Sequence, residues 1–293
     1  VIALDVGYGQ LHPRLREDPR VVVLERVNAR ELYELPFAPQ LVTCDVAFIS
    51  VRTALPPALG LAAPGWQAVV LVKPRPAVAQ AAANAKLPIG VIGSGRIGGT
   101  IGGLWVKSGH PVMFSSRHPD ELKDMVAKLG SLAQAGSVEQ AIAFGDVLFI
   151  AVPYGAIPQI GRDYSATMKG KIMLDACNAV LTRDGDIANE VEQNGIGTTS
   201  QKYLAGARIV RAFNTMSYMT FARDAHRPDP KLAILIAGDD AQAVQTAAGL
   251  VRDAGFDPVV VGNLADARRF QRGQPGYGQP VPAAELKKIL SLP

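Results

Sequence analysis

The sequence predicts an α/β protein built on a doubly wound, mostly parallel sheet, and three observations lead to this class. From residue 87 onward, apolar strand-like runs alternate with helical segments, a pattern typical of βαβ units. A glycine-rich turn joins the first of these strands to the first helix. A shorter α/β segment precedes an alanine- and proline-rich stretch that has nothing large to bury. We therefore expect an N-terminal fragment at residues 1–74, a linker at 75–86 and a doubly wound domain at 87–293.

The strands of the doubly wound domain are predicted from short apolar runs bounded by turn residues. They are expected at Ile89–Ile92, Val112–Ser115, Val147–Val152, Lys171–Asp175, Ile209–Ala212, Leu232–Ala237 and Pro258–Val261, with a weakly marked third strand at Leu132–Ala135. Helices are expected at Ile97–Ser108, Asp120–Leu129, Val138–Phe144 and Ala241–Ala254, followed by a loop at Arg272–Gln279 and a short helix at Ala283–Leu290.

The N-terminal fragment also has an α/β pattern. Strands are expected at Val1–Asp5, Val21–Leu24, Leu41–Ile49 and Gln67–Lys73, and a helix at Val51–Leu61. About 75 residues are few for an independent domain that must cover both faces of a parallel sheet. We therefore expect this fragment to lean on its neighbour or on a second chain, as in a homodimer.

Composition narrows the class of protein. With 48% hydrophobic and 19% charged residues and a net charge of +4, a disordered chain or a nucleic-acid-binding tail is disfavoured. The densest basic stretch, Arg14 to Arg30, is interleaved with acidic residues and indicates a solvated face. Cys44 and Cys177 lie in apolar runs and suggest free thiols in a reducing compartment. No metal-ligand spacing, signal peptide or membrane-length apolar run is present, so a cytoplasmic protein without a metal or membrane partner is expected.

The glycine-rich turn predicts a dinucleotide site of the Rossmann type. It consists of Gly93, Ser94, Gly95, Arg96, Ile97 and Gly98. Gly93 allows the tight turn, Gly95 lets a pyrophosphate approach the backbone, and Gly98 lets the helix pack closely on its strand. The free N–H groups and the positive end of the helix dipole favour an anion there. A strand before the motif and a helix after it make the dinucleotide interpretation stronger than that of a purely structural turn.

The end of the second strand indicates which dinucleotide. An NAD site usually carries an acidic residue here for the ribose 2′-hydroxyl, but this chain has Ser115, Ser116 and Arg117. An arginine and two hydroxyls suit a 2′-phosphate, because the guanidinium binds it bidentately and the serines donate hydrogen bonds. The sequence therefore favours NADP(H). The alternative is a solvated strand end with a serine that caps the next helix.

The doubly wound domain resembles the NADP-dependent oxidoreductase family that includes the coenzyme F420:NADP oxidoreductases and the oxidoreductase domains of the STEAP metalloreductases. The resemblance rests on the glycine turn, on SSRHP at 115–119, VLFIAVP at 147–153, DACN at 175–178, AFNT at 212–215, and AGDD at 237–240 with its helix. It implies an NADPH site at the carboxyl ends of the strands and hydride transfer to a flat redox partner.

The same resemblance implies further site residues. Ala151, Val152 and Pro153 match the wall beside the cofactor, and Asn178 and Asn214 match positions that line the nicotinamide pocket. For the two asparagines, turn formation by side-chain hydrogen bonding is an equal alternative. Tyr154 is a candidate for stacking on a ring or an ordinary surface aromatic, and His118 a candidate for contacting the adenosine phosphate or capping a helix. No catalytic residue is assigned, because hydride transfer between bound partners needs positioning more than acid–base groups.

The N-terminal fragment resembles part of the haemolysin-A-like ribosomal RNA 2′-O-methyltransferases. The matching stretches are ALDVGYGQL at 3–11, CDVAFIS at 44–50 and LVKP at 71–74. The resemblance implies that Asp5 holds the ribose of S-adenosylmethionine and that Asp45 and Lys73 help to activate the RNA hydroxyl. The family's first strand and its glycine-rich donor-binding loop are absent from this chain. Methyl transfer and nucleic acid as a partner are therefore disfavoured, and a fusion remnant that packs or dimerises is expected.

Three functions follow. The first is an NADPH-dependent reductase that transfers hydride to a flavin-like acceptor: the deazaflavin F420, FAD or FMN, with a small carbonyl or imine compound as an open alternative. The second is a non-catalytic NADP(H)-binding sensor, suggested by the short chain after Arg268. The third is an RNA 2′-O-methyltransferase.

Overall fold

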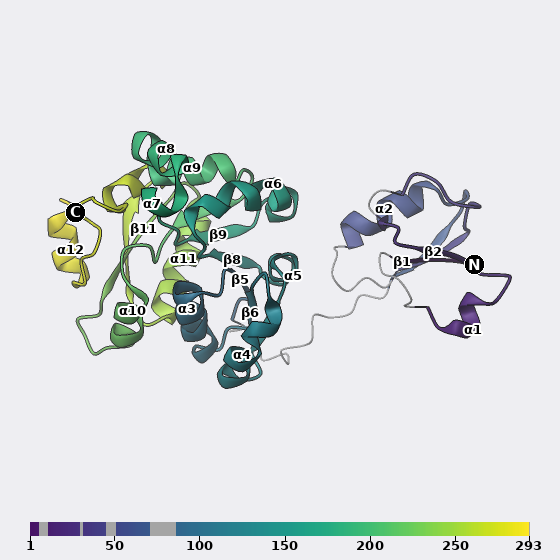
Figure 1. Cartoon of the computed structure of the whole chain (residues 1–293), viewed down its shortest axis with the longest axis horizontal. Helices are drawn as coiled ribbons and strands as arrows, with labels where there is room; N and C mark the ends of the chain where they lie inside the picture. The colour runs from purple at the N-terminus through teal and green to yellow at the C-terminus, as the bar shows by residue number, and fades with distance from the viewer. Residues whose placement is uncertain (6–10, 30–31, 45–50, 71–85, 293) are drawn as a thin grey trace. The chain divides into compact units, whose positions relative to one another are not determined.

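A computed structural model describes the chain except for residues 6–10, 30–31, 45–50, 71–85 and 293. Its internal contacts divide the chain into two compact units, Val1–Asn84 and Ala85–Pro293 (Figure 1). The division falls within the segment predicted to be a linker.

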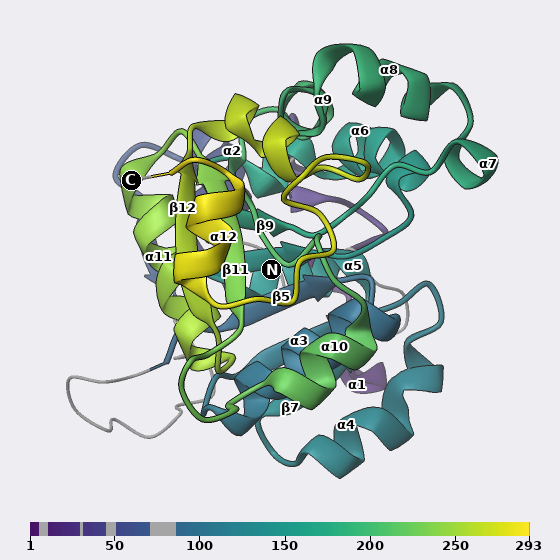
Figure 2. The ribbon, with the colours of Figure 1, turned by 90° about the vertical axis from the view of Figure 1, so that its left-hand side faces the viewer.

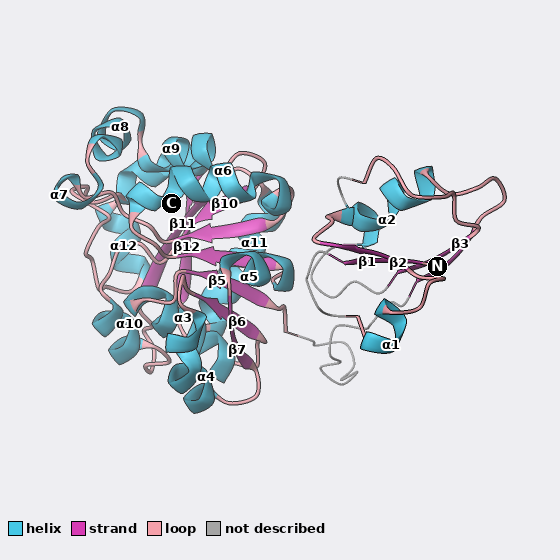
Figure 3. Cartoon of the chain, turned by 45° about the vertical axis from the view of Figure 1, so that its right-hand side comes forward, coloured by secondary structure: helices cyan, strands magenta, loops and turns pink. Residues whose placement is uncertain are grey.

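The second unit is built on one eight-stranded sheet (Figure 3). Its strands are β5 (Ile89–Ile92), β6 (Val112–Ser115), β7 (Ala133–Gly136), β8 (Val147–Ile150), β9 (Ile172–Asp175), β10 (Arg208–Arg211), β11 (Ala233–Gly238) and β12 (Asp257–Gly262). The spatial order is β12-β11-β10-β9-β8-β5-β6-β7. Every neighbouring pair is parallel except β10 and β11, which pair antiparallel. The predicted doubly wound, mostly parallel sheet is therefore confirmed.

The winding of this sheet reverses beside β5. The chain runs outward from β5 through β6 to β7 and then returns to β8, on the other side of β5, before continuing to β9 and β10. These six strands have the order of a Rossmann fold, in which ligands bind beyond the carboxyl ends of the strands at the point of reversal. In this unit that point lies between β5 and β8.

Helices cover both faces of the sheet and bury two apolar cores (Figure 2). The helices are α3 (Arg96–Lys107), α4 (Lys123–Leu129), α5 (Val138–Phe144), α6 (Ile157–Met168), α7 (Leu181–Asp184), α8 (Asp186–Asn194), α9 (Ile196–Tyr203), α10 (Tyr218–Asp224), α11 (Ala241–Asp253) and α12 (Ala283–Ile289), with 3-10 turns η2 (Pro119–Leu122), η3 (Tyr154–Ala156) and η4 (Leu264–Phe270). One core centres on Trp105, whose ring meets Phe149 and Phe213 edge to face at centroid distances of 5.0 and 5.7 Å.

Side-chain caps set the beginnings of several helices. Before α5, Ser137 accepts a hydrogen bond from the Gln140 amide and Gln140 accepts one from the Ser137 amide, which is a capping box. Before α11, Asp240 accepts one from the Ala243 amide. Helix α3 has Gly95 as its N-cap and, like α4, α6, α8 and α9, has no side chain that caps it.

With one exception, the predicted elements agree with the described residues to within about two residues at their ends. The exception is the helix predicted at Asp120–Leu129, which is divided into the 3-10 turn η2 and a helix α4 that begins only at Lys123. The weakly marked third strand is β7, one residue later than predicted. Strand β8 ends at Ile150, two residues before the predicted end. Helices α6 to α10 were not predicted. Two of them illustrate the reason, because α8 buries only Val191 and α10 only Phe221 and Asp224, which leaves a weak apolar period in the sequence.

The first unit contains two parallel strand pairs among its described residues. Strand β1 (Ile2–Asp5) pairs with β2 (Val22–Glu25), and β3 (Leu41–Cys44) pairs with β4 (Gln67–Val70). The helices are α1 (Pro13–Arg16), which was not predicted, and α2 (Val51–Gly60). The predicted ends of the third and fourth strands lie outside the described residues. No helix in the described part of the chain is long and apolar enough to cross a membrane.

Candidate functional site

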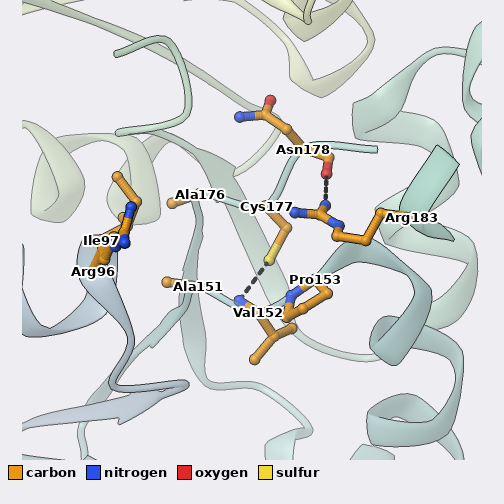
Figure 4. A pocket seen from close by; sticks show the side chains of 9 residues that line it. All are labelled: Arg96, Ile97, Ala151, Val152, Pro153, Ala176, Cys177, Asn178 and Arg183. Atoms are coloured by element: carbon orange, nitrogen blue, oxygen red, sulfur yellow. Dashed lines mark hydrogen bonds between the residues drawn. The ribbon is translucent and has the colours of Figure 1, made fainter. Parts of the chain in front are cut away.

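A cavity of about 330 Å³ opens at the point where the winding of the sheet reverses. The beginning of α3, the segments that follow β8 and β9, and helix α7 all contribute to its wall (Figure 4). Its lining residues are Arg96, Ile97, Ala151, Val152, Pro153, Ala176, Cys177, Asn178 and Arg183. Six of these nine residues carry no charge or side-chain amide, so the wall is mostly apolar with a few polar groups, as expected of a small-molecule site.

The glycine turn is held by close backbone packing. Gly93 has a φ of +95°, and a Cβ atom there would lie 2.6 Å from Val152 Cγ1 and 2.7 Å from the Ala151 carbonyl oxygen. A Cβ atom on Gly98 would lie 1.9 Å from the Gly93 carbonyl oxygen. A side chain at Gly93 would push the turn away from the segment that follows β8, and one at Gly98 would push α3 away from the turn and β5. Both glycines therefore have the packing roles predicted for them.

The beginning of helix α3 has the properties of an anion site. A Cβ atom on Gly95 would have no atom within 4 Å, so this residue faces open space. The first amides of α3 have no side-chain cap, and the buried Ser94 hydroxyl has no hydrogen-bond partner. Unpaired donors at a helix N-terminus favour a negatively charged ligand. The residues present therefore fit a pyrophosphate.

The end of β6 offers two groups for a 2′-phosphate rather than the three predicted. Arg117 is exposed and makes no hydrogen bond or ion pair with the described residues. Ser116 accepts a hydrogen bond from the His118 amide, which leaves its hydroxyl proton free to donate. Ser115, in contrast, is fully buried and donates to the Val91 carbonyl oxygen at 2.8 Å. Its side chain ties β6 to β5 and is removed from the predicted phosphate clamp.

The two aromatic candidates near these motifs have other roles. Tyr154 is fully buried, and its hydroxyl contacts the Ser200 hydroxyl at 2.9 Å and the Ile196 carbonyl oxygen at 3.2 Å. Burial raises the pKa of this phenol, so it stays neutral. Both predictions for Tyr154, a stacking ring and a surface aromatic, are wrong. His118 is exposed at the N-cap of η2, but its side chain makes no capping hydrogen bond.

A buried ion pair supports the cavity wall at the end of β9. Asp175 and Arg211 are both 0% exposed, and their charged groups lie 2.6 Å apart on neighbouring strands. Asp175 accepts from the Cys177 amide at 2.8 Å, and Arg211 donates to the Cys177 carbonyl oxygen at 2.7 Å. Asp175 also accepts from the Ser200 hydroxyl. The pair therefore forms hydrogen bonds with both the amide and the carbonyl group of Cys177, which lines the cavity.

Cys177 lies on this wall as a neutral thiol. It is buried, and its sulfur accepts a hydrogen bond from the Val152 amide at 3.4 Å (Figure 4). Burial and then the nearby Asp175 carboxylate raise the pKa of the thiol well above its usual value. The reactive thiolate is thus disfavoured, and the side chain joins the walls formed after β8 and β9.

The two predicted asparagines are adjacent, but only one lines the cavity. Asn178 is a lining residue, and its amide donates to the Asn214 carbonyl oxygen at 2.7 Å. Asn214 is 2% exposed and donates to the Phe270 carbonyl oxygen at 3.2 Å. Asn214 therefore does not line the cavity, and its backbone carbonyl group instead accepts the hydrogen bond that holds the Asn178 side chain in place. The predicted contact of Asn214 with nicotinamide is replaced by this supporting role.

Arg183 is a lining residue that was not predicted from the sequence. Its guanidinium donates to both carboxylate oxygens of Asp184 and to the Asn178 carbonyl oxygen. Burial favours protonation of Asp184, but hydrogen bonds from Arg183 and from the Gly155 and Val180 amides outweigh it and lower the pKa of the carboxyl. An arginine beside an aspartate is common in sequence, so no local signal distinguished this pair.

Arg96 is the second cation on the wall. It is the first residue of α3, and its guanidinium lies 5.3 Å from the centroid of the Tyr218 ring, within the range of a cation–π interaction. Helix α10, which carries Tyr218, packs against α3. Among the described residues, no group of three or more His, Cys, Asp or Glu side chains is arranged to hold a metal ion.

The fold and this site define a Rossmann-type unit with a nucleotide cleft, and comparison with known families agrees. Residues 88–179 match the family NADP oxidoreductase, coenzyme F420-dependent. Residues 1–86 match the FtsJ-like methyltransferases. Both resemblances predicted from the sequence are confirmed.

Individual relatives show the same two parts. Metalloreductase STEAP3 of Rattus norvegicus is 30% identical over 190 residues, 62% of this chain and 35% of that protein. The 16S/23S rRNA (cytidine-2'-O)-methyltransferase TlyA of Mycobacterium tuberculosis is 52% identical over 77 residues, 26% of this chain and 29% of that protein. A crystal structure of a hypothetical protein from Sinorhizobium meliloti is 26% identical with a TM-score of 0.57, and the match covers 67% of this chain and 95% of that one. The chain thus spans about a third of the length of these two curated relatives.

The residues singled out in the first unit are only partly described. Asp5 is the last residue of β1. Asp45 and Lys73 lie outside the described residues, so the predicted methyltransferase groups are not brought together by the part of the chain that is described.

Proposed function

We propose that the second unit is an NADPH-dependent oxidoreductase that transfers hydride between NADPH and a flavin-like or deazaflavin acceptor. The observation that carries this proposal is the uncapped beginning of α3 at Gly95, which faces open space beside the cavity. The match of residues 88–179 to an NADP oxidoreductase family supports the same activity. FAD, FMN and F420 are the acceptors that we propose to test.

Different residues of the chain would hold the different parts of the cofactor. The amides after Gly95 and the Arg96 guanidinium would hold the pyrophosphate. Ser116 and Arg117 would hold the 2′-phosphate, since an arginine binds phosphate bidentately. The apolar side chains of Ala151, Val152 and Pro153 would lie against the nicotinamide, with Asn178 at its edge.

The chemistry itself comes from the cofactor, because bound NADPH supplies a hydride from its nicotinamide ring. The chain orients the ring, holds the acceptor in contact with it and excludes water, which accounts for the apolar wall. None of the described side chains that line the cavity is arranged as a general acid or base, since the Cys177 thiol is neutral. The nearby Asp184 carboxylate already accepts hydrogen bonds from four donors. The proton that accompanies reduction of the acceptor would come from solvent.

Calorimetric titration with NADPH, NADH and S-adenosylmethionine, followed by assays of NADPH oxidation with FAD, FMN and F420, tests the proposal. We expect NADPH to bind and to be oxidised over many turnovers. Binding of NADPH without turnover on any acceptor would instead indicate a sensor. Binding of S-adenosylmethionine alone would shift attention to the first unit.

The choice of NADPH over NADH has its own test in Arg117→Gln. Because Arg117 is exposed and has no partner among the described residues, its loss should leave folding unchanged. We expect NADPH binding to weaken by roughly tenfold, the worth of one charge-assisted contact, with NADH binding unaltered. Ser115→Ala serves as the contrast, since its hydroxyl is tied to Val91 and should not affect discrimination. Unchanged discrimination in R117Q would refute the 2′-phosphate assignment.

A further inference from the structure

Arg183 lies on the cavity wall across from Arg96 (Figure 4). Arg96 begins α3 beside the glycine turn, whereas Arg183 belongs to α7 and lies near Asn178 and Pro153. The cavity therefore has a cation at its pyrophosphate end and another at the end proposed for nicotinamide and the acceptor. Among the described residues, two guanidinium groups and no acidic side chain line it, an arrangement that favours an anionic ligand.

Arg183 is held in a fixed orientation from behind. Its Nε and Nη2 donate to the two oxygens of Asp184 at 3.0 and 2.8 Å, and Nη2 also donates to the Asn178 carbonyl oxygen at 2.6 Å. The Asp184 side chain is only 1% exposed. It also accepts from the Gly155 and Val180 amides. Its oxygens are thus filled by fixed donors, and its task is to hold the guanidinium.

One face of this guanidinium remains free. The Arg183 side chain is 47% exposed, and its Nη1 group makes no hydrogen bond to any described residue. An arginine whose fork is oriented by a buried carboxylate, with donors left over, loses little entropy when it binds an anion. Such donors are well suited to phosphate oxygens.

The phosphates of NADPH already have partners elsewhere under the proposed function. The pyrophosphate belongs to the beginning of α3, and the 2′-phosphate belongs to the end of β6, on the other side of β5. We propose that Arg183 binds the phosphate group of the second substrate and so selects a planar acceptor that carries one over an acceptor that does not. This inference rests on the proposed function, since it takes the acceptor to lie beside nicotinamide.

FMN and riboflavin provide the test, because they share the same ring system and differ by one phosphate. The binding of each is measured by flavin fluorescence on the full chain saturated with NADP⁺, which cannot reduce the flavin. We expect FMN to bind at least about tenfold more tightly than riboflavin, the effect of one charge-assisted contact. In R183Q this preference should fall to less than about twofold, through weaker FMN binding alone. R183K should retain part of it, because lysine binds phosphate as a point charge.

Arg223→Gln is the matched control. Arg223 makes the same two-point pair with the next residue, Asp224, at the end of a short helix, but it does not line the cavity. R223Q should keep the wild-type preference for FMN. Riboflavin is a second control, since a variant with a distorted cavity would weaken both flavins equally.

The outcomes separate this inference from the proposed function. Equal binding of FMN and riboflavin by the wild type, absence of FMN binding, or a preference that survives in R183Q would each overturn the role of Arg183. NADPH binding and oxidation, measured in parallel with both flavins, decide the proposed function independently. Turnover that is equal with FMN and riboflavin would support the reductase and refute its selection of phosphate.

Discussion

The two walls of the cavity are held by opposite means. The wall at the glycine turn is held by close packing of the backbone. Gly93 lets the turn approach the Ala151–Val152 segment, and Gly98 lets α3 approach the turn and β5. The wall at residues 175–184 is held by two ion pairs, Asp175–Arg211 and Arg183–Asp184. The first pair forms hydrogen bonds with the backbone of Cys177, and the second with the backbone of Asn178. The first wall depends on missing side chains and the second on paired charges.

This difference teaches what each wall can tolerate. Close packing of backbone fails when volume is added, with a cost that depends on how far the neighbours can shift. A buried ion pair fails when one partner is removed, because the remaining charge is left in an apolar interior. We therefore expect added side-chain volume to damage the glycine wall and removal of one charged partner to damage the wall at residues 175–184.

The largest expected effect is the loss of one partner of the buried pair. Arg211→Met should lower the free energy of unfolding by about 3–5 kcal/mol, because it leaves the Asp175 carboxylate buried without its cation. The double variant D175N/R211M should be more stable than R211M, since no uncompensated charge remains. Chemical denaturation of the wild type, R211M, D175N and the double variant measures both effects.

The matched control for this prediction is an exposed pair. Lys202 and Glu190 lie 2.7 Å apart with side chains 61% and 22% exposed, and K202M should destabilise the protein far less than R211M does. A double variant as unstable as the sum of its single variants would show that Asp175 and Arg211 are not energetically coupled.

The second prediction contrasts two glycines of the same motif. Gly98→Ala should cost about 1–3 kcal/mol of stability, since its methyl group meets the Gly93 carbonyl oxygen. Gly95→Ala should change stability by less than about 0.5 kcal/mol, because its methyl group enters open space. It should still weaken NADPH binding by roughly tenfold or more, as the pyrophosphate must approach there.

Thermal melts and NADPH titrations of both variants separate the two roles. If G95A binds NADPH as tightly as the wild type, the pyrophosphate does not lie against this residue. If G98A is as stable as the wild type, α3 and the glycine turn can move apart far enough to accommodate the methyl group without loss of stability.

The same contrast explains how much of the fold was predictable from sequence. Strands β5, β6 and β8 are apolar runs between clear turn signals, and their order follows from the handedness of βαβ units. Helices α8 and α10 bury few residues, so their periodicity is faint. The antiparallel pairing of β11 with β10 depends on tertiary packing and has no local mark in the sequence.

The site residues also fall into those that the local sequence predicts and those that only the assembled fold brings together. The glycine turn and Arg117 were predicted, because a strand, a turn and a helix read in succession define that wall locally. Arg183 and the pairing of Asp175 with Arg211 were missed, because their partners come together only when β9, β10 and α7 assemble. Ser115 shows the converse error: its residue type suited a phosphate, but its side chain is fully buried and its hydroxyl donates to the Val91 carbonyl oxygen of β5.

The smallest expected effect concerns pH and the Arg183–Asp184 pair. Because hydrogen bonds hold the pKa of Asp184 below its usual value against the cost of burial, the ionised carboxylate stabilises the folded state above the pKa of an unfolded aspartate. That contribution is lost as the pH falls through the lower folded value. Asp184→Asn should therefore lower stability by about 1–2 kcal/mol at pH 7, and the gap to the wild type should close below roughly pH 4.

Denaturation of wild type and D184N from pH 7 to pH 3 measures this gap. The Asp184 side chain is only 1% exposed, so salt should reduce the gap less than it would for a surface pair. D224N is the comparison, since its carboxylate pairs with Arg223 in the same two-point geometry, and the pKa of that carboxyl is lowered too. Asp224 receives no backbone donors matching those from Gly155 and Val180. A pH-independent gap for D184N would mean that shape and hydrogen bonding, rather than charge, hold Arg183 at the cavity, and the guanidinium would then keep its orientation in the asparagine variant.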